Sequence, residues 1–338
     1  MTITNEIETV PCNLCGADEP SVVYQLPLSD FYPGRYQTQE WSIVSCNQCG
    51  LVYTNPRLTQ EKLYEFYQFG DQDDLQYVED HFIESADLQH RTWHQYLRVL
   101  QKHKPAQTTS GGPHQLLDIG CGAGSFLAEA QSLGYVVEGQ EISPYFIDYC
   151  RSHHHFTIHE GFLDDLSLEP ASYDCITAFD VLEHHPDPTA LFTQIHRLLK
   201  PGGVMMMSTP DIGNWSARRY GAKWLHIHPI GHIYYFDRQT ISMLFQKTKF
   251  TCVQVGGIHT IGASAWDTAQ NYVTQFIRVV LLRSALIGVY KPVTARIPAL
   301  TRWQVTLGNA TLNHEKLLMR IGHQVVMDDT MVFVAQKR

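Results

Sequence analysis

The sequence predicts an α/β fold: a doubly wound, Rossmann-like, mainly parallel sheet, with a small cysteine-rich module before it and a helical insert before the last strand. Three observations predict it. Strand-like and helix-like segments alternate along the middle of the chain, a glycine-rich turn follows the first of these strands, and two CxxC pairs lie near the N-terminus. Strands that alternate with helices pair in parallel, because each parallel connection needs a crossover of helical length.

The alternating segments begin after a linker. Residues 104–114 are rich in Gly, Pro, Ser and Thr, which favours a domain boundary near residue 112. Beyond it, apolar runs predict strands and apolar residues at helical spacing predict helices. The predicted strands are 115–120, 135–142, 173–182, 204–210, 250–257 and 327–338, and the predicted helices are 125–134, 144–153, 189–200 and 239–247.

These elements divide the chain into four segments. Residues 1–56 are turn-rich and hold both CxxC pairs, and residues 57–111 are expected to form a helical connector and a linker. The main α/β domain comprises 112–257 and 325–338. The apolar stretch between its last two strands, 258–324, predicts a mostly helical insert.

Composition and charge exclude several classes of protein. Hydrophobic residues make up 44% of the chain and charged residues 17%, as in folded proteins. The net charge of -9 and the lack of a Lys/Arg run argue against a nucleic-acid partner. The N-terminus lacks the pattern of a secretory signal, so we expect a cytoplasmic protein. Arg278 and Arg283 interrupt the most apolar run, so no membrane-spanning helix is expected, whereas a peripheral membrane contact and a homodimer stay open.

Four cysteines, Cys12, Cys15, Cys46 and Cys49, form two CxxC pairs, each followed by a glycine. Four thiolates in two close pairs suit a tetrahedral Zn²⁺. The 30 residues between the pairs exceed the usual spacing, so the loop between them must extend outwards. A redox-active dithiol would need a strand–helix context that PCNLCGADEP lacks, and a nucleic-acid-binding ribbon disagrees with the charge. The pattern predicts one structural zinc ion.

A glycine-rich loop, with Gly120, Gly122 and Gly124, follows Asp118 at the end of the first strand of the main domain. Glycines permit a tight turn and a close approach of backbone to ligand, and the helix that follows offers free N–H groups. The order GxGxG differs from the GxGxxG of dinucleotide-binding proteins, which disfavours NAD. Glu141 ends the next strand, where a carboxylate can accept hydrogen bonds from ribose hydroxyls. The loop therefore predicts a ligand that contains an unmodified ribose.

These motifs resemble those of a known family. DIGCGAGS, EIS, YDCITAFDVLEHHPDP and LLKPGG stand in the order and at the spacing seen in class I S-adenosylmethionine-dependent methyltransferases, over about residues 114–257. The resemblance implies S-adenosylmethionine as cofactor. It implies that Asp118 and the glycines border the methionine part, that Glu141 holds the ribose, and that Phe179 and Asp180 lie near the methionine amino end.

One departure from the family pattern concerns the adenine. Many members have Gly-Asp after the third strand, with the Asp reaching the adenine amino group, whereas this chain has Gly161, Phe162, Leu163 and Asp164. We therefore expect apolar packing by Leu163 and backbone contacts to hold the adenine, with Asp164 as a polar contact. The resemblance agrees with a structural zinc, because a subset of these methyltransferases, including sugar methyltransferases, carries an N-terminal Cys₄ module.

Two histidine clusters contain candidate general bases. His184 follows Glu183 just after the predicted strand 173–182, at the strand end where ligands bind in open α/β sheets, and His232 lies in the later segment WLHIHPIGHIYYFD. Imidazole titrates near neutrality, so either cluster can take a proton from an acceptor hydroxyl. The resemblance favours His232, because related chains often carry a His followed by aromatic residues here. For each histidine, a packed or surface residue without a catalytic role is an equal alternative.

The sequence therefore predicts a methyltransferase that acts on a small-molecule acceptor, such as a sugar or a glycosylated or natural-product intermediate. O-methylation is favoured over C- or N-methylation. A non-catalytic scaffold that binds S-adenosylmethionine and zinc and regulates a partner is the alternative from another class. A nicotinamide-dependent sugar-modifying enzyme disagrees with the glycine spacing.

Overall fold

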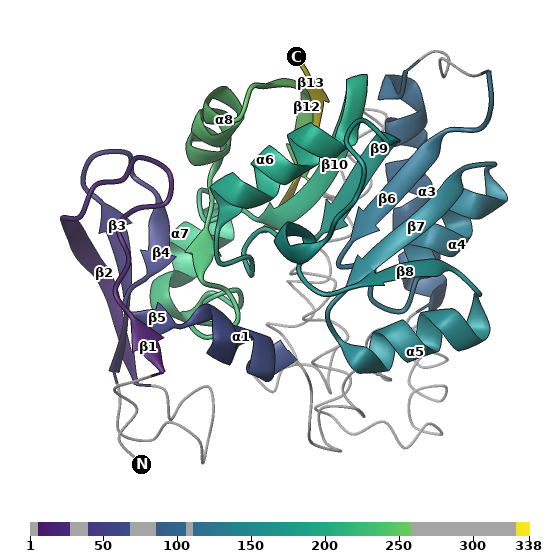
Figure 1. Ribbon diagram of the computed structural model, residues 1–338. Coiled ribbons are helices and arrows are strands. Elements are labelled where there is room, and N and C mark those ends of the chain that lie inside the picture. The colour runs from purple at the N-terminus through teal and green to yellow at the C-terminus, as the bar shows by residue number, and fades with distance from the viewer. Residues whose placement is uncertain (1–5, 28–39, 68–85, 106–110, 258–328) are drawn as a thin grey trace, which may run out of the picture.

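A computed structural model describes residues 6–27, 40–67, 86–105, 111–257 and 329–338 (Figure 1). The predicted helical insert, 258–324, lies outside the described residues. Within the described part, a seven-stranded sheet forms the body of the molecule and a four-stranded sheet belongs to the N-terminal module.

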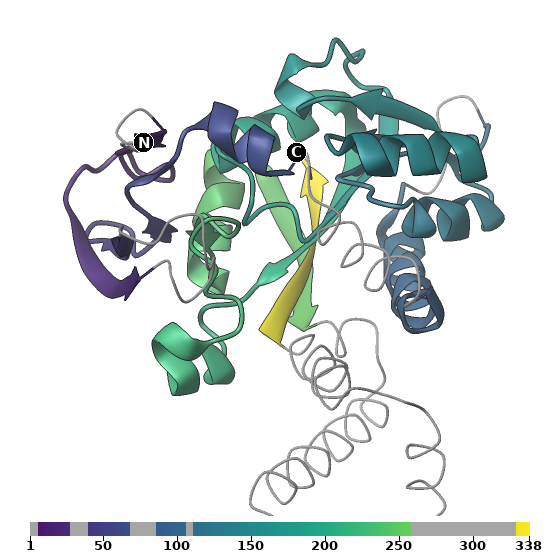
Figure 2. The ribbon, with the colours of Figure 1, turned by 90° about the horizontal axis from the view of Figure 1, so that it is seen from below.

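The larger sheet has the strand order β12–β13–β10–β9–β6–β7–β8, and β13 lies between β12 and β10 (Figure 2). The pairs from β10 to β8 are all parallel, whereas β13 is antiparallel to both of its neighbours. The predicted Rossmann-like, mainly parallel sheet is confirmed. Its strands are β6 (Gln115–Ile119), β7 (Val136–Glu141), β8 (Thr157–Glu160), β9 (Tyr173–Phe179), β10 (Leu199–Pro210), β12 (Phe250–Gly257) and β13 (Thr330–Lys337).

Helices cover both faces of this sheet, as a doubly wound fold requires. One face packs against α6 and α8, and the opposite face packs against α3, α4 and α5 (Figure 1). These helices are α3 (Ala86–His103), α4 (Ser125–Ser132), α5 (Pro144–His153), α6 (Pro188–Leu198) and α8 (Arg238–Lys247). The shorter elements are α1 (Gln60–Tyr67), α7 (Trp215–Tyr220) and the 3₁₀ helices η4 (Leu163–Asp165) and η5 (Gly221–Lys223).

Strand β10 shows why the sequences of the central strands contain uninterrupted runs of apolar residues. Met205 and Met207 belong to the core on the α6 and α8 side, whereas Val204 and Met206 belong to the core on the α3 and α4 side. All four side chains are buried. Successive side chains of a strand point to opposite faces, and here both faces are covered, so apolar side chains are favoured at all four of these positions.

The N-terminal module shares its sheet with the main domain. The sheet has the order β11–β4–β3–β2, and β11 comes from the segment after β10. The strands are β2 (Pro20–Pro27), β3 (Glu40–Cys46), β4 (Val52–Thr54) and β11 (Tyr234–Tyr235), and a separate pair joins β1 (Ile7–Glu8) to β5 (Arg57–Leu58). Trp41 and Tyr53 of the module belong to one core cluster with Tyr234 and Phe236. Sheet and core are thus continuous, and the four predicted segment boundaries stay predictions.

Arg57 links three segments at this junction. Its guanidinium donates hydrogen bonds to the Glu8 carboxylate at 3.0 Å, to the Pro186 carbonyl at 2.8 Å and to the Tyr234 hydroxyl at 3.0 Å. The side chain is only 10% exposed. A charged group so far from water needs such partners, so the arginine holds β1, the loop before α6 and β11 in fixed positions.

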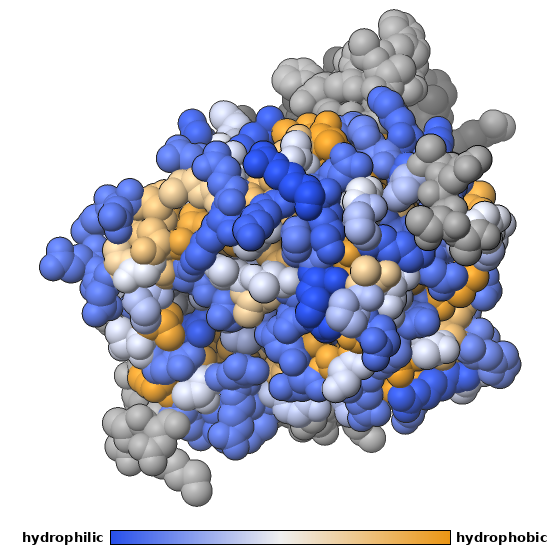
Figure 3. Space-filling view, turned by 45° about the horizontal axis from the view of Figure 1, so that its top comes forward, coloured by the Kyte–Doolittle hydropathy of each residue, from blue (hydrophilic) through white to orange (hydrophobic). Residues whose placement is uncertain are grey.

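The surface of the described residues is mainly polar. Hydrophilic residues predominate on the face in Figure 3, where apolar residues form small separate patches. The most exposed large apolar side chains are Trp215 at 71% and Leu225 at 65%. Among the described residues, no helix combines the length and the apolar character needed to cross a bilayer.

Candidate active site

The three glycines of the loop between β6 and α4 have different surroundings. Gly120, Gly122 and Gly124 all have positive φ angles, of 65°, 52° and 78°. A Cβ on Gly120 would lie 2.6 Å from Val181 Cγ2, and one on Gly124 would lie 2.9 Å from Cys150 Sγ, whereas a Cβ on Gly122 would meet no atom within 4 Å. The first and third glycines therefore make room for protein atoms. The space beside Gly122 is open to a ligand.

Glu141 organises the same loop through its carboxylate. Oε1 accepts the backbone N–H groups of Ile142 and Ser143 at 2.7 and 2.9 Å, and Oε2 accepts that of Gly122 at 2.9 Å. Burial raises the pKa of Glu141, and these N–H groups oppose that effect. A carboxylate offers roughly four acceptor positions, so about one is left for a ligand hydroxyl.

Asp118 lies at the end of β6, buried beneath the loop. Its Oδ1 accepts a 2.6 Å hydrogen bond from the Thr177 hydroxyl of β9. Burial raises the pKa of Asp118 to about 7, and the charge of Glu141 acts in the same direction. A positively charged group bound above the loop would stabilise the ionised form of this carboxyl.

Gln140 is a structural residue of the site that no sequence motif marks. Its backbone carbonyl and its side-chain Oε1 both accept from the Gly120 N–H, at 2.8 and 3.2 Å. Its side-chain Nε2 donates to the Gly161 carbonyl at 2.6 Å. Gln140 therefore ties the glycine loop to the segment that follows β8.

That segment borders an open pocket of about 500 Å³. Leu163 is buried in η4, whereas Asp164 is exposed. The ring of Phe162 lies 5.4 Å from that of Tyr64 in α1, measured between centroids. The pocket is lined by Gln60, Glu61, Tyr64, Gly161, Phe162 and Asp165.

Phe179 and Asp180 lie at the end of β9, and the two side chains have different partners. Phe179 packs against Tyr96 and Phe126, with centroid distances of 4.8 Å in both cases, and against Trp93 at 5.3 Å. Asp180 has φ 54°, and its carboxylate accepts from the Ser208 hydroxyl at 2.8 Å. An aromatic wall and a carboxylate therefore stand side by side at the carboxyl ends of the strands.

The structure brings the two predicted histidine clusters together. The rings of His184 and His232 lie 4.6 Å apart between centroids, and a side-chain oxygen of Glu183 and one ring nitrogen of each histidine lie within 4.8 Å of one another. This cluster lies near the glycine loop, because Val181, three residues before His184, borders Gly120. Residues far apart in sequence thus form one group beside the carboxyl end of β9.

Hydrogen bonds define which nitrogen of each imidazole carries a proton. His232 Nδ1 lies 2.9 Å from the His226 carbonyl, and His184 Nδ1 lies 2.9 Å from the Gly231 carbonyl. A carbonyl can only accept, so both Nδ1 atoms are donors and both neutral rings present a lone pair at Nε2. The Tyr67 hydroxyl, 2.7 Å from His184 Nδ1, donates to the same Gly231 carbonyl at 3.0 Å.

Burial keeps these imidazoles neutral. It lowers the pKa of His184 to about 4 and that of His232 well below its usual range, and the neighbouring histidines add to both effects. Burial, together with the charge of Asp180, raises the pKa of Glu183. Glu183 Oε2 accepts from the Thr209 hydroxyl at 2.9 Å. Sequence reasoning missed Tyr67 and Thr209, because neither belongs to a motif.

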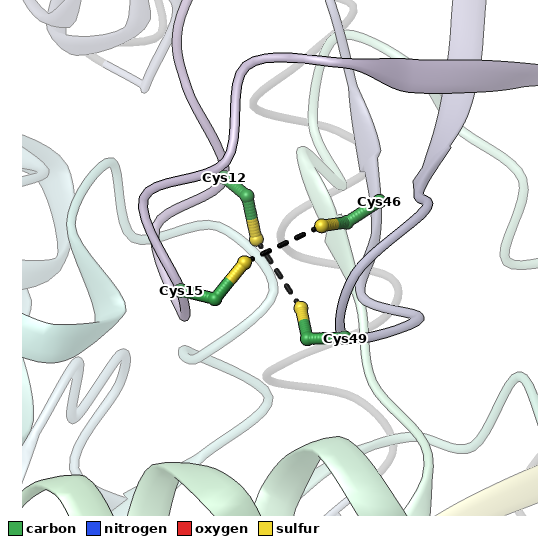
Figure 4. Close-up of side chains that lie close together, drawn as sticks. All are labelled: Cys12, Cys15, Cys46 and Cys49. Atoms are coloured by element: carbon green, nitrogen blue, oxygen red, sulfur yellow. Dashed lines mark hydrogen bonds between the residues drawn. The ribbon is translucent and has the colours of Figure 1, made fainter.

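The four predicted zinc ligands also converge (Figure 4). The Sγ atoms of Cys12 and Cys49 lie 3.4 Å apart, as do those of Cys15 and Cys46, and all four sulfurs lie within 4.8 Å of one another. In a tetrahedral zinc site with bonds of about 2.3 Å, the sulfurs are about 3.8 Å apart. The arrangement fits a four-thiolate metal site.

Each CxxC pair sits on a turn of the same geometry. The Gly16 N–H donates to the Cys12 carbonyl at 2.7 Å, and the Gly50 N–H donates to the Cys46 carbonyl at 2.9 Å. Both glycines have φ 80°, which L-residues rarely adopt. Burial raises the pKa of Cys12 to about 11, whereas at Cys46 the backbone N–H groups outweigh burial and lower the pKa to about 7.

Comparison with known proteins identifies the main domain. Residues 88–255 match a family described as "Methyltransferase domain". The chain contains a class I S-adenosylmethionine-dependent methyltransferase domain. The methyltransferase fold that the resemblance implied, with S-adenosylmethionine as its cofactor, is confirmed.

The methyltransferase domain also matches curated proteins over part of their length. It is 35% identical over 104 residues to a ubiquinone biosynthesis O-methyltransferase of Xanthomonas euvesicatoria. The aligned region is 28% of this chain and 42% of that protein. It is 36% identical over 102 residues to the protein of the same name in Xanthomonas campestris, with the same coverage. The match thus spans less than half the length of these relatives.

Solved structures that are similar to the chain include two methyltransferases. One is phosphoethanolamine N-methyltransferase 2 of Haemonchus contortus, with 20% identity and a TM-score of 0.48, over 72% of this chain and 52% of that one. The other comes from the complex of a Haloferax volcanii methyltransferase with its activator Trm112, with 16% identity and a TM-score of 0.48, over 79% of this chain and 98% of that one.

We predict that Gly120→Ala destabilises the methyltransferase domain more than Gly122→Ala. Both variants place a Cβ on a residue of positive φ, which costs about 1–2 kcal/mol. Only Gly120→Ala adds a clash with the stiff, branched Val181 side chain, 2.6 Å from the new Cβ. Overpacking of this kind costs about 1–3 kcal/mol more in the free energy of unfolding. Chemical denaturation followed by circular dichroism measures both values, and equal losses would contradict the steric argument.

Proposed function

We propose that the protein transfers the methyl group of S-adenosylmethionine to a hydroxyl group of a small polar acceptor, such as a sugar or a glycosylated or natural-product intermediate. The observation that carries the proposal is the group of Glu183, His184 and His232 beside the cofactor loop, with two neutral imidazoles that present lone pairs at Nε2. The curated relatives that match this domain are O-methyltransferases by name, which favours oxygen as the acceptor atom.

The cofactor contacts follow from the loop geometry. We propose that the ribose binds the remaining acceptor position of Glu141 and that the backbone of Gly122 lies against the ligand, because only there is the space open. The methionine part would lie between the loop and the end of β9, and the adenine would enter the pocket beside Gly161. The proposed contact residues are Asp118, Gly120, Gly122, Gly124, Glu141, Leu163, Asp164, Phe179 and Asp180.

The acceptor proton needs a base. S-adenosylmethionine supplies a methyl group on a sulfonium, which is already activated for transfer. His232 Nε2 would take the hydroxyl proton while the acceptor oxygen forms its bond to the methyl carbon, the carbon–sulfur bond breaks and S-adenosylhomocysteine leaves. The His226 carbonyl would continue to accept from Nδ1–H and would stabilise the imidazolium. His184 is the second candidate, either as base or as the group that orients the acceptor.

We further propose that Cys12, Cys15, Cys46 and Cys49 hold one structural Zn²⁺. Four thiolates leave no open position for a substrate, so the ion stabilises the fold and takes no part in the reaction. The ion would fix the turns at Gly16 and Gly50 and, through β3 and β4, the sheet that ends at β11.

The activity is tested with the intact protein. Native mass spectrometry of the purified chain identifies a co-purified acceptor, and formation of S-adenosylhomocysteine with that acceptor measures turnover. Methylation of a hydroxyl oxygen, located by NMR of the product, supports the proposal. A product methylated at nitrogen or carbon refutes the oxygen assignment, and tight cofactor binding without turnover on the co-purified molecule favours the regulatory scaffold.

We predict that Glu141→Ala lowers the affinity for S-adenosylhomocysteine at least tenfold. The substitution removes a charge-assisted hydrogen bond to the ribose, worth about 1.5–3 kcal/mol, and leaves three loop N–H groups without their acceptor. Isothermal titration calorimetry measures the affinity. Glu138→Ala is the matched control, because this carboxylate lies on the same strand but bonds to His159 and Tyr173. Equal affinities for both variants would remove Glu141 from the site.

We predict that His232→Ala lowers the rate of methyl transfer by about 10²- to 10⁴-fold, the usual loss when a general base is removed. His184→Ala should lower it less. Single-turnover kinetics measure the chemical step, and calorimetry checks that cofactor affinity is retained. His196→Ala is the control, because this histidine lies on α6 and contacts Phe250. If both site variants keep more than about a tenth of the rate, alignment of the reactants is the main source of catalysis.

We predict that the Cys₄ module keeps one tightly bound zinc ion per chain after dialysis against a weak chelator. Cys46→Ser should lose this ion and lower the melting temperature of the whole chain, because the module and the methyltransferase domain share one core. Elemental analysis and scanning calorimetry measure the two effects. Cys252→Ser is the control, because Cys252 is exposed. A metal-free protein with four titratable thiols and an unchanged melting temperature would contradict the assignment.

A further inference from the structure

The group of Glu183, His184 and His232 contains more than a candidate base. Three atoms that can accept a proton or bind a cation, one from each side chain, lie within 4.8 Å of one another. They come from two separate segments of the chain, the loop after β9 and the segment before β11. Main-chain hydrogen bonds join these two segments to one another, because the N–H groups of Ile233 and Tyr234 donate to the Glu183 carbonyl at 2.9 and 3.1 Å.

The other polar atoms of this group are already satisfied. Each imidazole Nδ1 donates to a backbone carbonyl, and Glu183 Oε2 accepts from Thr209. What is left is two Nε2 lone pairs and Glu183 Oε1. Oε1 is fully buried and has no hydrogen-bond partner among the described residues. Its distance of 4.0 Å to His184 Nε2 is too long for a hydrogen bond.

A buried oxygen of this kind lacks a partner in either protonation state. If Glu183 is ionised, its Oε1 has no cation beside it. If Oε1 is protonated, no acceptor lies within hydrogen-bond distance of it. Buried polar atoms without a partner are rare and indicate an ion or ligand that completes the site. A cation placed between Glu183 Oε1, His184 Nε2 and a ring nitrogen of His232 would give the buried oxygen a partner.

We propose that Glu183, His184 and His232 bind a divalent transition-metal ion such as Zn²⁺, in addition to the ion of the Cys₄ module. Two imidazoles and a carboxylate are a donor set for such ions, and three protein ligands leave a position open. Metal-bound histidines almost always donate their second nitrogen to a carbonyl or carboxylate, and both rings do so here.

Binding requires the three side chains to move closer together. Metal–ligand bonds of about 2.0–2.2 Å place neighbouring ligand atoms about 3–3.5 Å apart, so the 4.0 Å separation of Glu183 Oε1 and His184 Nε2 must shorten by less than about 1 Å. The His184 side chain is 29% exposed, which leaves room for its ring to turn. The hydroxyl of Tyr67 limits that turn by holding Nδ1.

An ion at this site excludes base catalysis by His232, because both use the same Nε2 lone pair. Bound metal would therefore slow methyl transfer, and its removal would restore the rate. This consequence rests on the proposed function, whereas metal binding itself does not. The site is thus an inhibitory metal site as long as His232 is the base.

Another cluster of similar composition lies elsewhere on the surface. His90 and His94 of α3 lie beside Glu129 of α4, and their ligand atoms are as close together as those of the proposed site. The His90 and His94 side chains are 53% and 39% exposed, and Glu129 bonds to both, so no atom there is buried without a partner. This cluster serves as the matched control.

The test uses Co²⁺ added to protein whose Cys₄ site is already filled with zinc. Visible absorption then separates the two environments, since thiolate ligands give strong charge-transfer bands and a nitrogen–oxygen site gives only weak d–d bands. We expect one equivalent of Co²⁺ per chain with weak d–d bands. His184→Ala and Glu183→Gln should each weaken this binding at least tenfold, whereas the double variant His90→Ala/His94→Ala should keep it. Calorimetric binding of S-adenosylhomocysteine confirms that each variant is folded.

Two outcomes would overturn the proposal: no nitrogen–oxygen cobalt spectrum in the unmodified chain, or a spectrum that persists in His184→Ala and Glu183→Gln and disappears in the His90/His94 double variant. Failure of the proposed function gives a different result, in which the Co²⁺ spectrum appears as expected but no acceptor is methylated.

Discussion

The position of His232 depends on the main-chain hydrogen bonds of the segment that leads into β11. On one side, the Ile233 and Tyr234 N–H groups donate to the Glu183 carbonyl; on the other, the Ile233 carbonyl accepts from the Thr54 N–H at 2.9 Å. The segment is therefore held between the loop after β9 and the cysteine module. Without either partner, buried backbone groups would lose their hydrogen bonds, each at a cost of about 1–3 kcal/mol. The geometry of the candidate site follows from this arrangement.

Much of the fold could be predicted from the sequence, because the signals are local. The glycine loop after β6 needs positive φ angles, the central strands need apolar residues on both faces, and each CxxC turn ends in a glycine for the same conformational reason. The antiparallel placement of β13 between β10 and β12 leaves no such local mark. It is set by sheet topology, and a parallel strand at the edge of the sheet would have the same apolar sequence pattern.

The candidate site could be predicted only in part. Glu141, the glycines and the cysteines belong to motifs, so their roles can be proposed from spacing. The approach of His184 to His232 joins residues far apart in the sequence, and it depends on the pairing of β11 with β4. Strand β11 consists of only two tyrosines, which is too short a segment for the sequence to predict this pairing. Gln140, Tyr67 and Thr209 act through single hydrogen bonds. Such contacts leave no periodic or compositional trace.

The sharing of one sheet between the module and the methyltransferase domain has a consequence for the integrity of the chain. Strand β4 covers the pairing edge of β11, and the apolar side chains of both belong to one core. A chain that lost its first 56 residues would expose a strand edge and the apolar side chains of Tyr234 and Phe236 to other molecules, the combination that leads to edge-to-edge aggregation. The cysteine module thus covers a strand edge and an apolar surface of the methyltransferase domain.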